Sequence, residues 1–158
     1  MQEEIVTPQH ISHKAFYTIP LFGLTSMVCL IYDYKRISFL TFCLMLTSFS
    51  HWNLLKKEGL ERNMDRMMSV IVYSNFWIDA QTFCPEYRKW WSFLTVFNTG
   101  VYIANQYIFY RVYESTTDII IREKNDYGST YIHMFFIHVL PNVSFIYGIM
   151  TSRSCANT

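Results

Sequence analysis

Three histidines and one aspartate lie at the edges of long uncharged segments of this sequence. His51 is near the end of one such segment, and Asp65 precedes the next one, after the polar stretch "KKEGLERNM". His133 and His138 lie in "YIHMFFIHVLPN", at the start of the last uncharged segment. Imidazoles with a neighbouring carboxylate are typical of a catalytic zinc site, where three protein ligands leave a fourth position for water. Zinc lowers the pKa of that water to about 7 and so supplies a hydroxide that attacks a carbonyl.

The segments around these residues carry almost no charge. No Asp, Glu, Lys or Arg occurs in four segments of 18, 19, 21 and 26 residues, and a fifth segment of 19 residues holds only Asp79. In chain order the five segments are 15–32, 37–55, 67–85, 90–110 and 127–152. About 20 apolar residues cross a bilayer as a helix, whereas a soluble bundle would place charges on its wet helix faces. The pattern therefore predicts an integral membrane protein.

We expect an all-α fold, in which residues 1–158 form a single domain. This domain would be a polytopic transmembrane helix bundle with about five spans, at about 15–33, 37–55, 66–84, 90–112 and 130–150. Pro20 and Gly23 predict that the first span is kinked or re-entrant. The lipid bilayer is then the main partner, and a net charge of +1 gives no reason to expect nucleic-acid binding. Gly100 and Ala104 permit a close helix contact, which would allow a helix-mediated oligomer.

The basic residues of the expected loops indicate how the protein is oriented. Eight of them lie on the side of the N-terminal segment, the loop around "KKEGLERNMDR" and the loop 111–124: Lys14, Lys56, Lys57, Arg62, Arg66, Arg111, Arg122 and Lys124. Five lie on the opposite side: Lys35, Arg36, Arg88, Lys89 and Arg153. We therefore expect a cytosolic N-terminus and a lumenal or external C-terminus. Cys84 and Cys155 fall on this second side, where a disulfide between them can form if it is oxidising.

Five spans would bring the candidate ligands to one face of the membrane. His51 ends the second span, Asp65 precedes the third, and His133 and His138 lie in the first turns of the fifth, which enters from the same side. Ionisable residues within spans are costly and by default indicate function. The sequence therefore predicts a zinc site on the cytosolic side.

Three short motifs resemble a known family. A Ser/Thr-rich helix that ends in histidine ("LTSFSH"), an aspartate at the start of the next helix ("NMDR") and paired histidines in the last helix ("HMFFIH") are similar to the scattered pattern of the CREST superfamily. This superfamily includes the alkaline ceramidases and the progestin and adiponectin receptor family, which are seven-helix membrane proteins that hold a zinc ion.

The resemblance implies a metal-dependent lipid amidohydrolase whose substrate is a lipid amide such as a ceramide. It implies that His51, His133 and His138 bind the zinc ion. Asp65 would orient or deprotonate the water on the metal, and Ser48, one turn before His51, would assist at the oxyanion.

The sequence departs from the family pattern in three respects. The family spaces its last two histidines four apart, about 40° around an α-helix, whereas His133 and His138 are five apart, or about 140°. Both would reach one ion only if the helix were distorted, and Pro141, one turn on, is a cause of such distortions. The family serine, four residues before the first histidine, is replaced by Thr47, with Ser48 at three. Two of the seven family helices have no counterpart.

Two other interpretations stay open. In the first, the protein is a non-catalytic membrane scaffold or assembly component, organellar or viral, whose histidines extend to water and head groups. Asp65, beside Arg62 and Arg66, would then be a helix N-cap or part of a surface ion pair. In the second, the protein is a transporter or channel subunit, which would need paired charges or repeats within the membrane. Only one acidic residue, Asp79, lies inside a span and no repeat is visible, which argues against this interpretation unless Asp79 faces a continuous water-filled path.

Overall fold

The computed structural model describes residues 9–54 and 60–156, and within these ranges it contains helices and no strand. The helices are α1 (Gln9–Phe16), α2 (Pro20–Ile31), α3 (Lys35–Leu54), α4 (Leu60–Ala80), α5 (Pro85–Ser115), α6 (Ile119–His133), the π-helix η1 (Met134–Val139) and α7 (Leu140–Ala156). Only a short turn separates α1 from α2, and α6, η1 and α7 are continuous. The segments therefore form five rods, and the expected all-α fold is confirmed.

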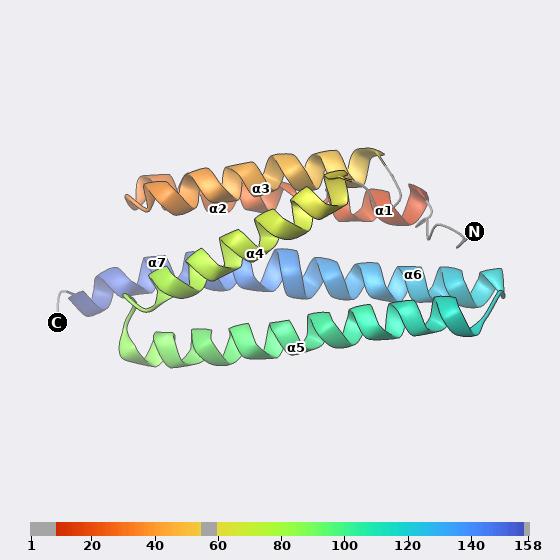
Figure 1. Ribbon diagram of the computed structural model, residues 1–158. Coiled ribbons are helices and arrows are strands. Elements are labelled where there is room, and N and C mark those ends of the chain that lie inside the picture. Colours follow the sequence, from red (N-terminus) through yellow and green to blue (C-terminus); the bar gives the residue numbers. More distant parts are fainter. Residues whose placement is uncertain (1–8, 55–59, 157–158) are drawn as a thin grey trace.

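The rods run along one common direction (Figure 1). α2 and α3 pack side by side, and α4 crosses obliquely from the end of α3 toward the start of α5. α5 and the rod α6–η1–α7 form a long antiparallel pair, against which α1 and α2 pack through α6 and α7. Each of the five segments expected from the sequence overlaps one rod. α1 and the end of α7 lie at opposite ends of the bundle.

Proline and aspartate determine where several helices begin. Pro20 and Pro85 each stand at the start of a helix, where the missing N–H has no helical partner to lose. A short turn at residues 17–19 precedes Pro20, and the expected kinked or re-entrant first span stays a prediction. Asp33 has a positive φ of 67° in the tight turn between α2 and α3, a conformation that aspartate tolerates better than most residues.

The expectation of a loop over 111–124 is wrong, because α5 and α6 extend into this segment and leave only residues 116–118 as the connection. The Asp118 carboxylate accepts hydrogen bonds from the backbone N–H groups of Ile120 and Ile121 and so caps α6. The Arg122 side chain donates to backbone carbonyls at the end of α5. These local bonds extend the helices beyond the apolar segments.

An aromatic core joins α4, α5 and α7. The rings of Phe76 and Phe145 stack with their centroids 4.1 Å apart, and the Trp91 ring lies edge-on to Phe145 at 5.6 Å. All three side chains are buried. Such rings bury large apolar areas, and offset or edge-on pairs add to the stabilisation.

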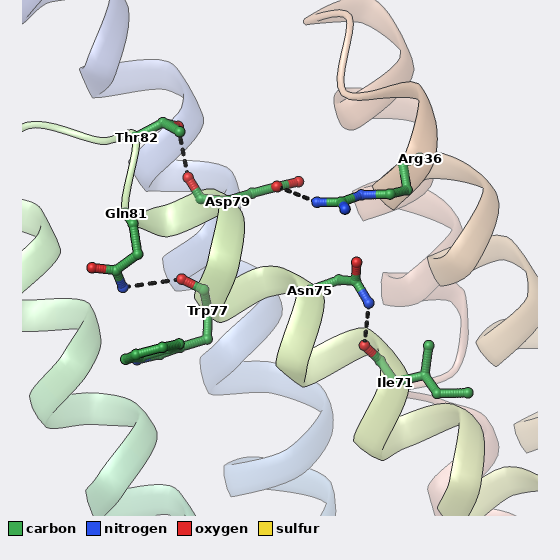
Figure 2. A network of polar contacts seen from close by, with 7 residues as sticks. All are labelled: Arg36, Ile71, Asn75, Trp77, Asp79, Gln81 and Thr82. Atoms are coloured by element: carbon green, nitrogen blue, oxygen red, sulfur yellow. Dashed lines mark hydrogen bonds and ion pairs between the residues drawn. The ribbon is translucent and has the colours of Figure 1, made fainter.

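Asp79 forms an ion pair with Arg36 that links the end of α4 to the start of α3. The Nη2 atom of Arg36 lies 2.5 Å from Oδ1 of Asp79. In Figure 2 the two side chains point toward one another, and the Thr82 hydroxyl donates to the backbone carbonyl of Asp79. The charge of Asp79 is thus compensated by a contact between two helices.

Large apolar side chains face outward on every rod. Examples are Met27, Phe39, Val70, Val96 and Phe135, each at least half exposed. Two helical stretches, His13–Ile31 and Ile119–Ser152, are long and apolar enough to cross a membrane.

Cys84, which directly precedes α5, is disulfide-bonded, whereas Cys29 and Cys43 are free thiols. Cys155 belongs to the last turn of α7, and α7 ends at the end of the bundle where α5 begins (Figure 1). The side chain of Cys155 falls outside the described part of the structure. The pairing of Cys84 with Cys155 therefore stays a prediction.

Candidate metal centre

The side chains singled out in the sequence come from three rods and lie toward the end of the bundle where α3 stops and α4 starts. His51 is in the last turn of α3, and Asp65 is in the second turn of α4. His133 ends α6 and His138 lies in η1. Ser48 lies one turn before His51 and bonds to Asp65.

The three imidazoles occupy one neighbourhood. The ring centroids of His133 and His138 are 5.0 Å apart. The Trp52 ring contacts both His51, at 4.9 Å, and His133, at 5.7 Å. Helices far apart in the chain thus bring His51 and His133 into contact with the same Trp52 ring, although connectivity alone does not require it.

The π-helix puts His133 and His138 on one face. In an α-helix the hydrogen bond joins residues four apart, which therefore lie above one another. In a π-helix it joins residues five apart, as the bond from the Leu140 N–H to the Phe135 carbonyl does here. Residues five apart in a π-helix therefore lie above one another, as residues four apart do in an α-helix. Pro141 favours this wider turn, because it lacks an N–H and its ring crowds the preceding turn.

Asp65 is a buried carboxyl, only 5% exposed. It accepts a hydrogen bond from Ser48 Oγ at 2.5 Å. Burial raises the pKa of Asp65 to about 6, and hydrogen bonds from Ser48 and Thr47 and the charge of Arg66 oppose the rise. Because α4 already begins at Leu60, Asp65 is not an N-cap. A carboxyl that titrates near neutral pH is suited to take up and return a proton.

Thr18 orients the His138 ring. Thr18 Oγ1 lies 2.7 Å from Nδ1 of His138 and donates its single proton to the carbonyl of Ala15 at 2.8 Å. The hydroxyl must then accept from Nδ1–H, which leaves Nε2 of a neutral His138 with a free lone pair. Metal-binding histidines are commonly oriented in this way by a hydrogen bond to their other ring nitrogen.

A buried amide supports the backbone of the π-helix. The Nδ2 atom of Asn142 donates to the His138 carbonyl at 2.7 Å, and its Oδ1 accepts from Thr25 Oγ1 at 2.7 Å. Asn142 and Thr25 are both fully buried. The amide thus joins α2 to the segment that carries His138.

These donors fit a zinc ion in type, because imidazole nitrogens are common zinc ligands. The rings of His133 and His138 lie edge-on to each other, with their centroids 5.0 Å apart. As the side chains stand, no group of three His, Cys, Asp or Glu residues in the described ranges could hold a metal ion. His51 would therefore have to approach the other two rings to complete the site.

A groove of about 770 Å³ begins beside Asp65 and His133 and extends between α4 and α5. Residues of η1 and the start of α7 also line it. Asp65, Arg66 and His133 line it at one end, and Trp77 and Trp91 line it further along the two helices. The lining is mostly apolar. The groove therefore offers an apolar chain a position next to the candidate metal ligands.

Sequence reasoning missed three residues of this region: Thr18, Trp52 and Asn142. No local pattern marks Thr18, because its contact with His138 depends on how the first rod packs against η1. Asn142 gave a usable signal, since an amide in an apolar segment needs partners when it is buried. The Nε1 atom of Trp52 is buried and has no hydrogen-bond partner among the described residues.

No family model, no curated protein and no solved structure matches the chain.

Proposed function

We propose that the protein is a membrane-embedded, zinc-dependent hydrolase of lipid amides, similar to the ceramidases. The observation that carries the proposal is the approach of His51, His133 and His138 beside the bonded pair Asp65 and Ser48. These residues come from three separate rods. Neither chain connectivity nor core packing calls for this combination of residue types at one place.

The membrane part of the proposal is a bundle of five spans, one per rod. It is supported by the large apolar side chains that face outward on all five rods, since soluble proteins rarely expose such extended apolar surface. The two helical stretches that are apolar and long enough to cross a membrane support it further.

The protein residues have distinct roles in the proposed reaction. His51, His133 and His138 would hold the zinc ion, which activates water and polarises the amide carbonyl when bound. Asp65 takes a proton from the attacking water and returns it to the amide nitrogen as the C–N bond breaks, so that a carboxylic acid and an amine are released. Ser48 holds the Asp65 carboxylate in place through its hydrogen bond.

Metal analysis of the purified protein tests this proposal. We expect about one zinc ion per chain and hydrolysis of a fluorescent ceramide in detergent micelles. The variant His133→Ala should lose both. The matched control is His10→Ala, because His10 is exposed on α1 and bonds to Glu123, away from the centre. Protein that folds but contains no zinc after purification with added ZnCl₂ would overturn the proposal.

The second candidate function is that of a non-catalytic membrane component. The observation that favours it is that no three described side chains are placed to hold a metal as they stand. The histidines and Asp65 would then serve only to join the rods. In that case His133→Ala would lower stability without any change in bound metal.

A further inference from the structure

The proposed hydrolysis leaves the carbonyl oxygen of the amide without a hydrogen-bond donor from the protein. When water adds to the carbonyl carbon, negative charge develops on this oxygen, and hydrolases place N–H or O–H donors beside it. The family resemblance assigns this task to Ser48. However, Ser48 has a single hydroxyl proton and donates it to Oδ1 of Asp65. Another side chain at the reacting end of the groove is therefore needed as the donor.

Tyr102, on α5, lies at this end of the groove. Its side chain lines the groove together with Asp65 and His133, and its ring centroid lies 6.3 Å from that of His133. The Tyr102 hydroxyl has no hydrogen-bond partner in the described part of the chain, and it is not enclosed, whereas the hydroxyls of Tyr73 and Tyr87 are buried. An accessible hydroxyl thus belongs to a side chain that lines the groove and contacts a candidate metal ligand.

The other donors of the lining are less suited to this task. Two hydroxyls donate their protons to backbone carbonyls of their own helix, those of Thr95 and Thr99. Arg66 extends to the hydroxyl of Tyr110, which is about 12 Å further along α5 than Tyr102. Ser69, one turn after Asp65 on α4, also lines the groove. Tyrosine is among the side chains that serve as donors in oxyanion holes, and here it also contacts His133.

We infer that the Tyr102 hydroxyl donates a hydrogen bond to the carbonyl oxygen of the lipid amide and stabilises the negative charge that this oxygen gains. This inference rests on the proposed function for the position of the amide beside Asp65 and His133. The water oxygen bonds to the carbonyl carbon, the π electrons of the C=O bond move to the oxygen that Tyr102 contacts, and a proton of the water goes to Asp65. When the C=O bond forms again, the C–N bond breaks and Asp65 returns the proton to the nitrogen. Tyr102 keeps its own proton throughout.

Infrared difference spectroscopy of metal-free protein tests this contact without hydrolysis. The probe is a saturated N-acyl amide with an isotope label on its carbonyl group, bound to protein that is kept in EDTA in phosphatidylcholine nanodiscs. We expect the labelled carbonyl band to lie at lower frequency in the wild type than in Tyr102→Phe, because a hydrogen bond weakens the C=O bond. Tyr107→Phe is the matched control: it removes a hydroxyl from the same helix at a position that is 64% exposed and outside the lining. It should give the wild-type band.

Kinetics with added zinc provide the second measurement. Tyr102→Phe should lower kcat about 100- to 1,000-fold and change KM little, because the hydrogen bond is strongest when the oxygen carries charge. Tyr107→Phe should keep the kcat of the wild type.

Three infrared results would overturn the inference. One is a wild type that does not bind the probe, and another is a band that Tyr102→Phe leaves in place. The third is a band that shifts in Ser69→Ala instead, because the contact would then belong to Ser69. A band that depends on Tyr102 in a protein that takes up no zinc would remove the hydrolase proposal and leave this contact in place.

Discussion

Asp65 is a single residue whose ionised form is costly to the fold. Burial raises its pKa from 3.8 to about 6. At neutral pH the folded protein therefore contains a buried, ionised carboxylate, whose charge would be more stable in water. A purely structural carboxylate usually shows the opposite shift, because its partners favour the charged form. The direction of the shift therefore fits a residue that is kept for chemistry.

This shift predicts that Asp65→Asn stabilises the metal-free protein. The pKa of Asp65 is higher in the folded than in the unfolded protein. The ionised carboxylate therefore lowers the free energy of unfolding by almost nothing near pH 4 and by its full amount above about pH 6. At pH 7.5 the variant should gain about 2–3 kcal/mol, and the gain should vanish toward pH 4. Thermal unfolding in detergent measures it. Asp79→Asn is the contrast, since it breaks the pair with Arg36 and should lose stability; a loss for Asp65→Asn as well would contradict the argument.

Thr18 supplies a second test at this scale. Thr18→Val keeps the shape of the side chain but removes the hydroxyl that orients His138. We expect zinc affinity to fall about 10- to 100-fold while the helix content stays unchanged, as measured by competition with a zinc chelator and by circular dichroism. Thr99→Val, on the exposed side of α5, is the control and should bind zinc like the wild type. Unchanged zinc affinity in Thr18→Val would show that the contact does not orient a ligand.

The residues that could be predicted here are those whose chemistry is evident from type alone. An imidazole or a carboxylate at the edge of an apolar segment is conspicuous, and His51, Asp65 and His133 were found in this way. Thr18 and Asn142 could not be ranked, because hydroxyls and amides are scattered through all the apolar segments. Only the packing of the rods decides which of these scattered groups meets a histidine.

Among the elements, the sequence indicated that a helix distortion was needed, but it did not indicate that the distortion would be a π-helix. A spacing of five between His133 and His138 is incompatible with a shared face on an α-helix, and Pro141 indicated where the distortion would fall. The number and order of the rods followed from the uncharged segments. The ends of α5 and α6 did not, because local capping by Asp118 extends helices through a charged stretch that hydropathy excludes.

Two glycines provide a matched test of how the rods pack. A Cβ at Gly148 on α7 would overlap the Tyr87 ring and lie 2.7 Å from the Phe83 ring of the segment leading into α5. Gly148→Ala should therefore lose about 1–3 kcal/mol in thermal unfolding. A Cβ at Gly100 meets nothing within 4 Å, so Gly100→Ala should gain up to about 1 kcal/mol from helix propensity. A loss for Gly100→Ala would indicate instead that this face packs against a second copy, as the Gly100 and Ala104 pair would allow.

At the scale of the whole molecule, the two ends of the bundle differ in chemistry. One end has Cys84 in a disulfide where α5 begins, and disulfides persist in oxidising compartments. The candidate metal ligands lie toward the other end, where α3 stops and α4 starts. If the rods cross a membrane, the disulfide assigns the metal-ligand side to the cytosol. The excess of basic residues in the sequence indicates the same side.

The disulfide itself can be checked by electrophoresis. We expect the wild type to migrate differently with and without reductant, because an intact bond restricts the denatured chain. Cys84→Ser and Cys155→Ser should each abolish the difference. Cys29→Ser and Cys43→Ser, which remove free thiols, should leave it unchanged. A Cys155→Ser variant that keeps the difference would mean that Cys84 bonds to another partner.

The orientation of the whole protein is the last prediction. If each rod crosses the membrane, the two termini lie on opposite sides, and the disulfide and the basic residues both predict a cytosolic N-terminal side. In sealed microsomes, an engineered glycosylation site after residue 158 should be modified, and one before residue 1 should not. The metal-ligand side can be tested in the same vesicles by introducing a single cysteine at Met64, an exposed position beside Asp65. A membrane-impermeant maleimide should label it from the cytosolic side. Labelling of Met64→Cys only after the vesicles are opened would place Asp65 and the histidines on the lumenal side, opposite to the assignment from the disulfide.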